Sequence, residues 1–384
     1  MSDVTIAALL FLLFSTADAS AQKSKVKSIQ WDIAGVLPST NGKALGFAGP
    51  VVGVSNDVLV VGGGSNFPDN MPWLGGKKRY YDDTYVFMKN GRDSLVLFKS
   101  AKLPFALAYA ASVSTRNGIV VAGGESENGV RKTVFIIKWV EGTQELSINK
   151  LPDLPLALTN ASIAAHNSTV YVAGGETSEG VSDQFFSLDL NTINSGWKSL
   201  PSLPKAISHA VMAVQSNGKN DCIYLVGGRK KNVDATSSLY ASNFQFDLTA
   251  NQWIEKKSLP HNLSAGTGVA VGPYSILLFG GDDGSTFHKA EELIFAINHE
   301  KDENRKVELT AEKIKVQSKH PGFCRQVLLY DTKKDQWQVV SCIPYDAPVT
   351  TTAVQWKDKI FIPGGEIRAG VRTPQILAAK TIIK

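Results

Sequence analysis

Two side chains near the end of the chain have the types and spacing needed for acid–base chemistry on an anionic ligand. Glu366 follows a pair of glycines, and Arg372 comes six residues later, in the turn Gly370–Thr373. A positioned carboxylate can take up and return a proton. A guanidinium is suited to bidentate binding of a carboxylate. The same two residues could instead form a structural ion pair, and the residues alone leave both interpretations open.

The glycine pair before Glu366 is one of six, each at the end of an apolar run. The pairs are 62–63, 123–124, 174–175, 227–228, 280–281 and 364–365, with steps of 61, 51, 53, 53 and 84 residues. A step near 50 residues with a double glycine is typical of kelch repeats, in which each repeat forms one four-stranded blade. The chain is therefore predicted to be an all-β protein, a six-bladed kelch-type β-propeller.

Two further features recur with the glycines. A Leu-Pro or Ile-Pro step lies upstream of most pairs, and its proline is expected to start an inner strand without needing a ladder donor. A tryptophan often precedes that step and is expected to fill the widening space between blades toward the rim. The prolines are Pro104, Pro155, Pro204, Pro260 and Pro344, and the tryptophans are Trp31, Trp197, Trp253 and Trp337.

The two ends of the chain are predicted to share the last blade. After Gly365 there is one more apolar run, Gln375 to Ile383, which leaves the sixth blade one strand short. The segment from Lys27 to Ile33 has a strand pattern around Trp31 and no blade of its own. We expect it to supply the missing outer strand, because this closes the ring without free edges.

The long step in the fifth repeat predicts an insertion at about 283–325. Its segments 287–297 and 303–316 are charged and show helical periodicity. The insertion leaves the loop after Gly281, which should open at the same mouth of the channel as Glu366. It could be a lid over the pore or a surface decoration, and both remain open.

We expect a ligand where the loops after the second strand of each blade converge on the axis. Glu125 and Glu176 share the position of Glu366 and are interpreted as acids that cap their turns. His209 could line the channel, although a structural role in an inner strand is the simpler interpretation. The predicted substrate-binding residues beside Arg372 are Asn66, Phe67, Arg229, Asp282 and Phe287, with Arg368 also in the loops.

Charge and cysteine content narrow the functional classes. The formal net charge is +5, and the basic runs 77–79 and 229–231 are interpreted as solvated loop faces. No continuous basic stripe with stacking aromatics indicates nucleic-acid binding. Of three cysteines, Cys222 is expected to be buried, and Cys324 and Cys342 could pair. No motif for nucleophilic hydrolysis or phosphate binding occurs, and no metal spacing.

The first 21 residues are interpreted as a signal peptide. Residues 6–15 are apolar, and Ala19-Ser20-Ala21 is a small-residue cleavage site. No other stretch has the length of a membrane span. We therefore expect an exported, periplasmic protein whose mature part, residues 22–384, is one propeller with no membrane insertion.

Several motifs together resemble the bacterial N-acetylneuraminate (sialic acid) mutarotases. They are Gly46-Phe47-Ala48-Gly49, Val54-Ser55-Asn56-Asp57, Gly62-Gly63-Gly64, Gly123-Gly124-Glu125 and the turn from Gly365-Glu366 to Gly370-Val371-Arg372-Thr373. The match spans essentially the whole mature chain and is similar to a cyclic permutation, with the first of these motifs near the start instead of the end. Permutation is acceptable because blades are equivalent modules.

The resemblance implies a function for the pore. Glu366 would be the proton-transfer residue and Arg372 would hold the sugar's carboxylate, whereas the Ile367-Arg368 step departs from the family and carries no role over. The implied activity is interconversion of the α and β anomers of N-acetylneuraminate, a small-molecule sugar acid, which needs no metal or organic cofactor. The alternatives are a non-catalytic kelch propeller that binds protein or glycan, and a mutarotase for another sugar acid.

Overall fold

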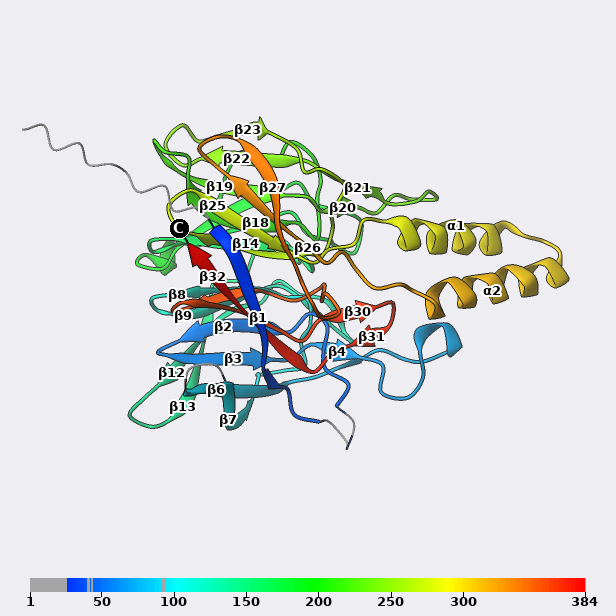
Figure 1. Cartoon of the computed structure of the whole chain (residues 1–384), viewed down its shortest axis with the longest axis horizontal. Helices are drawn as coiled ribbons and strands as arrows, with labels where there is room; N and C mark the ends of the chain where they lie inside the picture. Colours follow the sequence, from blue (N-terminus) through cyan, green and yellow to red (C-terminus); the bar gives the residue numbers. More distant parts are fainter. Residues whose placement is uncertain (1–25, 40–41, 43, 92–93, 384) are drawn as a thin grey trace, which may run out of the picture.

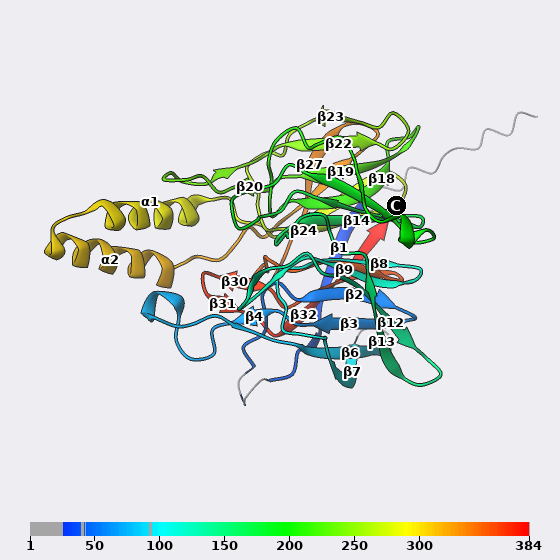
Figure 2. The same ribbon diagram turned by 180° about the vertical axis from the view of Figure 1, so that it is seen from behind.

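A computed structural model describes residues 26–39, 42, 44–91 and 94–383. Within them, six four-stranded antiparallel sheets surround a common axis as the blades of a propeller (Figure 1, and from behind in Figure 2). The predicted all-β, six-bladed fold is confirmed.

The first three blades, from the axis outward, are β2 (Val51–Ser55), β3 (Val58–Gly62), β6 (Asp83–Asn90) and β7 (Ser94–Lys102); β8 (Ala111–Thr115), β9 (Gly118–Ala122), β12 (Val134–Val140) and β13 (Glu145–Leu151); β14 (Ser162–His166), β15 (Thr169–Ala173), β16 (Phe185–Asp189) and β17 (Lys198–Ser199). The next two are β18 (Val211–Ser216), β19 (Asp221–Val226), β22 (Asn243–Asp247) and β23 (Gln252–Lys256); β24 (Thr267–Val271), β25 (Ser275–Phe279), β26 (Gln326–Asp331) and β27 (Gln336–Cys342). The first strand of each blade contacts the first strand of its neighbours around the axis.

The sixth blade joins both ends of the described chain, as predicted. It consists of β28 (Val354–Trp356), β29 (Lys359–Pro363), β32 (Gln375–Ile383) and β1 (Val26–Val36). Strand β1 pairs antiparallel with β32 along its whole length. Trp31 of β1 packs edge-on against Phe279 of the fifth blade, with ring centroids 5.7 Å apart. The N-terminal strand thus completes one blade and covers the side of another.

Tryptophans occupy the spaces between blades, as expected, and also hydrogen-bond across them. Three indole N–H groups donate to backbone carbonyl oxygens of the preceding blade, Trp197 to Pro152 at 2.8 Å, Trp253 to Pro201 at 3.0 Å and Trp337 to Lys257 at 2.7 Å. Each bond satisfies the polar end of a large apolar side chain. At these three junctions the repeated tryptophan therefore links neighbouring blades.

The glycine pair of the first repeat is shifted by one residue from its predicted place. Gly63 and Gly64, with φ of 65° and 91°, adopt the conformation of the pair 123–124, with φ of 68° and 95°. Gly62 instead ends β3, where an added Cβ would lie 2.8 Å from the Oγ1 of Thr84. Three consecutive glycines allow either alignment, and the turn after the strand decides between them.

A closed circle of backbone hydrogen bonds surrounds the axis. Each blade contributes one residue, which lies shortly before its inner strand and has φ between 50° and 64°. Its N–H donates a hydrogen bond to the carbonyl of the equivalent residue in the preceding blade. The bonds run from Tyr109 to Gly49 at 2.8 Å, Asn160 to Tyr109 at 3.0 Å, His209 to Asn160 at 3.0 Å, Ala265 to His209 at 2.9 Å, Thr350 to Ala265 at 2.9 Å and Gly49 to Thr350 at 2.7 Å. We call these six residues the axial ring. It separates the channel between the inner strands from a cavity at one mouth, because all six members border the channel and all except Gly49 also border the cavity.

The insertion forms two helices, α1 (Ser285–His299) and α2 (Glu303–Ser318), as predicted. The carboxylate of Asp302 caps α2 by accepting a hydrogen bond from the Arg305 N–H at 3.0 Å. Both helices project from the propeller on the side of its small hairpins (Figure 1). Among the described helices, none combines the length and the apolar character of a membrane span. The predicted signal peptide, residues 1–21, lies outside the described residues.

Candidate functional site

The glycine pairs place one side chain from each blade at the mouth of the channel. The residue after each pair forms an antiparallel bridge with the residue that precedes an axial-ring member. The six bridges are Ala48–Ser65, Ala108–Glu125, Thr159–Glu176, Ser208–Arg229, Ser264–Asp282 and Val349–Glu366. We call Ser65, Glu125, Glu176, Arg229, Asp282 and Glu366 the bridge residues. Four are acids, so the repeated turn sets up a largely carboxylate-lined mouth.

A cavity of about 340 Å³ lies at this mouth, within the size range of small-molecule sites. Its floor is formed by five members of the axial ring, all except Gly49. Its wall contains five of the bridge residues, Ser65 being the exception, together with Lys78. The insertion supplies the remaining side, with Thr286, Phe287, Ala290, Gln317, His320 and Phe323. The base of the insertion is therefore part of the wall, while the helices extend away from it.

Glu366 and Arg372 are brought together, as the sequence predicts. They are cross-strand partners in the hairpin of β30 (Glu366–Arg368) and β31 (Val371–Arg372). The Nη2 of Arg372 lies 3.5 Å from the Oε2 of Glu366, and the Gly370 N–H donates to Oε1 at 2.8 Å. The Glu366 side chain is 19 % exposed and lines the cavity, whereas that of Arg372 is 4 % exposed and lies behind it.

The predicted binding residues Asn66 and Phe67 have different surroundings. Phe67 lies over the guanidinium, with its ring centroid 4.8 Å from Cζ. Asn66 is buried and does not line the cavity, because its amide donates to the Gly46 carbonyl at 3.0 Å and accepts from the Tyr81 hydroxyl at 2.9 Å. The structure thus gives Asn66 contacts within the first blade, and Phe67 a contact with Arg372.

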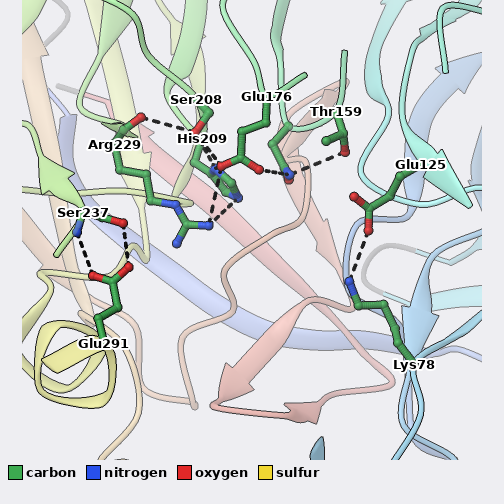
Figure 3. Close-up of polar contacts among 10 residues, drawn as sticks. Lys78, Glu125, Thr159, Glu176, Ser208, His209, Arg229, Ser237 and Glu291 are labelled. Carbon is green, nitrogen blue, oxygen red and sulfur yellow. Dashed lines mark hydrogen bonds and ion pairs between the residues drawn. The ribbon is translucent and has the colours of Figure 1, made fainter. Parts of the chain in front are cut away.

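Arg229 belongs to a polar cluster on the fourth blade (Figure 3). Its Nη2 lies 3.2 Å from the Nε2 of His209, and the Nδ1 of His209 lies 3.0 Å from the Ser208 hydroxyl. That hydroxyl donates to the carboxylate of Glu176 at 3.0 Å. Burial, followed by the charge of Arg229, holds the pKa of His209 well below its usual range. His209 is therefore neutral at neutral pH and accepts from the guanidinium.

Lys78 also lines the cavity, which corrects the interpretation of residues 77–79 as a solvated loop face. Its ammonium donates to the Glu125 carboxylate at 3.1 Å, and the Tyr80 hydroxyl donates to the same oxygen at 2.7 Å. Burial acts to lower the pKa of Lys78. The electrostatic interactions with Tyr109, Glu125 and Tyr80 outweigh this effect, so the pKa of Lys78 is raised. Burial, together with the bond to Glu125, raises the pKa of Tyr80 to about 12.

The carboxylates of Glu125 and Glu176 bind neighbouring side chains instead of capping their own turns. Glu125 is held by Lys78 and Tyr80, whereas Glu176 accepts from Asn160 at 3.3 Å as well as from Ser208. The predicted turn-capping role is therefore corrected to a role in the cavity wall. The physical reason is the bridge geometry, which directs these side chains toward the mouth.

The fifth blade contributes the acid Asp282, whose pKa is shifted. Burial raises the pKa of Asp282, although the Gly284 N–H, which donates to its carboxylate at 2.9 Å, acts in the opposite direction. Burial lowers the pKa of His320, although the charges of Asp282 and Glu366 act to raise it. Phe287 of α1 stacks on Arg229, with its ring centroid 4.8 Å from Cζ. Both predicted residues, Asp282 and Phe287, therefore line the cavity.

Three other predictions concern groups outside the cavity wall. Arg368 points to the rim and pairs with Asp346 at 3.2 Å.

Cys324 and Cys342 are both free thiols, so the possible disulfide is not formed, and Cys222 is buried as expected. No group of three or more metal-ligating side chains occurs in the part of the chain that the structure describes.

The sequence contained a usable signal for some cavity residues that the interpretation missed. Tyr109, Asn160 and Ala265 each come five residues after the proline of a Leu-Pro step, so the repeat itself marks the axial ring. Lys78 lies in a long loop, and Gln317, His320 and Phe323 lie in the insertion. These four have no counterpart in other repeats, so periodicity could not place them.

Comparison with known proteins identifies the family to which this chain is similar. The family model described as N-acetylneuraminate epimerase matches residues 151–382. An N-acetylneuraminate epimerase of Haemophilus influenzae is 24 % identical over 234 residues, 61 % of this chain and 60 % of that protein. One of Salmonella typhi is 26 % identical over 231 residues, 60 % of this chain and 58 % of that protein.

A Kelch domain-containing protein of Vibrio cholerae is also similar, at 24 % identity over 238 residues, 59 % of this chain and 63 % of that protein. The chain thus spans about 60 % of the length of these curated relatives. The family match includes Glu176, Arg229, Asp282, Glu366 and Arg372 of the site. On a match over more than half its length, this chain belongs to the N-acetylneuraminate epimerase family.

Proposed function

We propose that this protein is a mutarotase that interconverts the α and β anomers of N-acetylneuraminate in the mouth cavity, with Glu366 as the proton carrier. The observation that carries the proposal is the setting of Glu366. It is a bridge residue in the wall of a cavity of small-molecule size, and it lies within the matched family region. Its carboxylate is oriented by the Gly370 N–H and by Arg372, at 2.8 Å and 3.5 Å.

The chemistry requires two proton movements at one carbon. The Glu366 carboxylate removes the proton of the anomeric hydroxyl, whose O–H electron pair forms the C=O bond of the open-chain ketone. The bond from the anomeric carbon to the ring oxygen breaks, and that oxygen takes the proton from Glu366. After rotation the steps reverse on the other face of the carbonyl, and the carboxylate is regenerated. A single positioned carboxylate is sufficient for this relay.

The cavity also supports binding of a polyhydroxylated anion. Its four carboxylates can accept hydrogen bonds from hydroxyl groups, and Lys78 and Arg229 can donate hydrogen bonds to a carboxylate. Phe287 provides an apolar surface against which a sugar face could pack. Positioning of this kind contributes to rate by holding the reacting groups in place.

Proton NMR of anomer exchange tests the proposal. A substoichiometric amount of protein should accelerate relaxation of N-acetylneuraminate from one anomer toward the equilibrium mixture. A non-catalytic propeller would shift or broaden ligand signals without accelerating exchange, which would contradict the proposal. Acceleration only of a 2-keto sugar acid without the N-acetyl group would indicate a mutarotase for another sugar acid.

We also propose that residues 1–21 are removed during export to the periplasm, leaving residues 22–384 as one propeller. The apolar run at 6–15 and the small residues at 19–21 support this. Mass spectrometry of the protein recovered from a periplasmic extract tests it, and a cytoplasmic protein that retains residue 1 would contradict it.

A further inference from the structure

Arg229 presents its guanidinium to the cavity, two blades away from Glu366. Its side chain is 21 % exposed and forms part of the cavity wall. One side of the group is used within the protein, where Nη2 lies 3.2 Å from His209 and 3.9 Å from the carboxylate of Glu176. Nη1 has no hydrogen-bond partner among the described residues and points away from His209 (Figure 3).

Neighbouring residues fix the direction of this guanidinium. Because an arginine can only donate, the Nε2 of His209 accepts from it, and the ring proton is on Nδ1, where it reaches Ser208. The Ser208 hydroxyl in turn donates a hydrogen bond to the carboxylate of Glu176. The resulting network holds the guanidinium from one side. A group held in this way loses little rotamer freedom when it binds a ligand.

The insertion holds Arg229 from the other side. Phe287 stacks on its guanidinium at 4.8 Å. Helix α1 is itself attached to the fourth blade, because Glu291 accepts two hydrogen bonds from Ser237, at 2.8 Å from its N–H and 2.7 Å from its hydroxyl (Figure 3). His288, next to Phe287, lies 2.8 Å from the Ser237 carbonyl. The stacked ring is therefore anchored beside Arg229.

Arg372 has a different setting. Its side chain is 4 % exposed, its Nη2 faces Glu366 at 3.5 Å, and Phe67 covers its plane at 4.8 Å. Its Nε and Nη1 are both buried without hydrogen-bond partners among the described residues, whereas in Arg229 this holds for Nε alone. It does not belong to the cavity wall. A ligand in the cavity reaches Glu366 and Arg229 directly, but Arg372 only past Glu366.

We infer that Arg229, and not Arg372, binds the carboxylate of the sugar acid, and that Arg372 positions Glu366. The inference rests on the proposed function, because it takes a sugar acid as the ligand. Because the carboxylate and the anomeric hydroxyl are attached to the same carbon, it places this carbon between Arg229 on the fourth blade and Glu366 on the sixth. Arg229 is thus a specificity-determining residue, which selects acids over neutral sugars.

Calorimetric titration with N-acetylneuraminate and with its methyl ester tests this assignment, since the ester removes the charge and adds only a methyl group. Wild type should bind the acid more tightly than the ester by roughly 10- to 100-fold, the usual strength of charge-assisted hydrogen bonds. Arg229→Gln should remove most of this preference and leave ester binding close to that of wild type. Arg372→Gln should keep the preference.

A preference that persists in Arg229→Gln, or that disappears in Arg372→Gln alone, would overturn the inference. So would a wild type that does not distinguish acid from ester. If Arg229→Gln does not fold, Arg229→Lys decides, because it keeps the charge and loses the planar fork. A several-fold smaller preference supports the inference, and an unchanged one overturns it. Failure of the proposed function is seen separately, as absence of accelerated anomer exchange by wild type.

Discussion

Glu366 and Arg372 face each other across the hairpin β30–β31, with the Nη2 of the arginine 3.5 Å from the Oε2 of the carboxylate. Only the carboxylate lines the cavity. The two residues that the sequence marks as a chemical pair therefore have unequal access to a ligand. This relationship separates their roles, since the exposed member can exchange protons and the buried member can orient it.

Arg372→Gln should lower kcat more than it raises KM. The substitution removes the positive charge beside Glu366 and frees its carboxylate to move, and misplacement of a reacting group by about 1 Å can cost roughly 10²-fold in rate. Steady-state kinetics of anomer exchange by NMR provides the measurement. An increase in KM with unchanged kcat would show instead that Arg372 contributes to substrate binding.

Phe287→Ala should raise KM or the dissociation constant by roughly 2- to 30-fold, because stacking of a guanidinium on an aromatic ring contributes about 0.5–2 kcal/mol. Phe295→Ala is a matched control on the same helix, since Phe295 is 43 % exposed, its ring contacts that of His299 and it does not line the cavity. Equal effects of the two substitutions would contradict a specific role for the ring over Arg229.

His209→Gln should reduce the loss of stability in acid. Burial first, and Arg229 second, depress the pKa of His209 below the ordinary value of 6.5. The unfolded chain therefore takes up a proton that the folded chain does not, so stability present above pH 6.5 is lost as the pH falls below it. Glutamine does not titrate and still offers an acceptor to Arg229.

Urea unfolding of both proteins from about pH 7 to about pH 5 measures this difference. The free energy of unfolding should decrease more for wild type than for His209→Gln. A constant gap between the two curves over that range would show that protonation of His209 does not destabilise the fold.

The axial ring predicts opposite effects for two substitutions at equivalent positions. Gly49→Ala should destabilise by more than about 1 kcal/mol, because φ is 64° and the new Cβ would lie 2.6 Å from the backbone nitrogen of Tyr109. Ala265→Gly should stabilise by up to about 1 kcal/mol, because it relieves a left-handed alanine with φ of 57°. Urea denaturation compares them, and a stable Gly49→Ala protein would argue against a tightly closed ring.

The repeat pattern was sufficient to predict the propeller, its closure by β1 and the helices of the insertion. These features depend on period, apolar alternation and turn residues, all of which are local in the sequence. The alignment of Gly62 and Gly63 was wrong by one residue because three consecutive glycines fit the repeat in two ways. The φ angles of Gly63 and Gly64, and the hydrogen bond from the Gly64 N–H to the Leu107 carbonyl at 2.7 Å, resolve the choice.

The site was predicted in part, for a physical reason. Glu366, Asp282 and Arg229 follow glycine pairs, so the repeat places them at one mouth. Lys78 and His320 enter the cavity from a long loop and from the insertion, whose paths depend on tertiary contacts. The different exposure of Arg372 and Arg229 was also beyond the sequence, because it depends on tertiary packing: a phenylalanine lies over each guanidinium at 4.8 Å, yet only Arg229 lines the cavity.

The central claim is that Glu366 transfers protons during anomer exchange, and one measurement tests it most directly. The rate of exchange of N-acetylneuraminate is measured by proton NMR with wild type, with Glu366→Gln and with Glu308→Gln as a control on the exposed face of α2. Glutamine keeps the size of the side chain and removes its ability to carry a proton. We predict that Glu366→Gln lowers the catalysed rate by roughly 10²–10⁴-fold, the usual effect of losing general acid–base catalysis, while the control matches wild type. A folded Glu366→Gln protein with the wild-type rate would contradict the account.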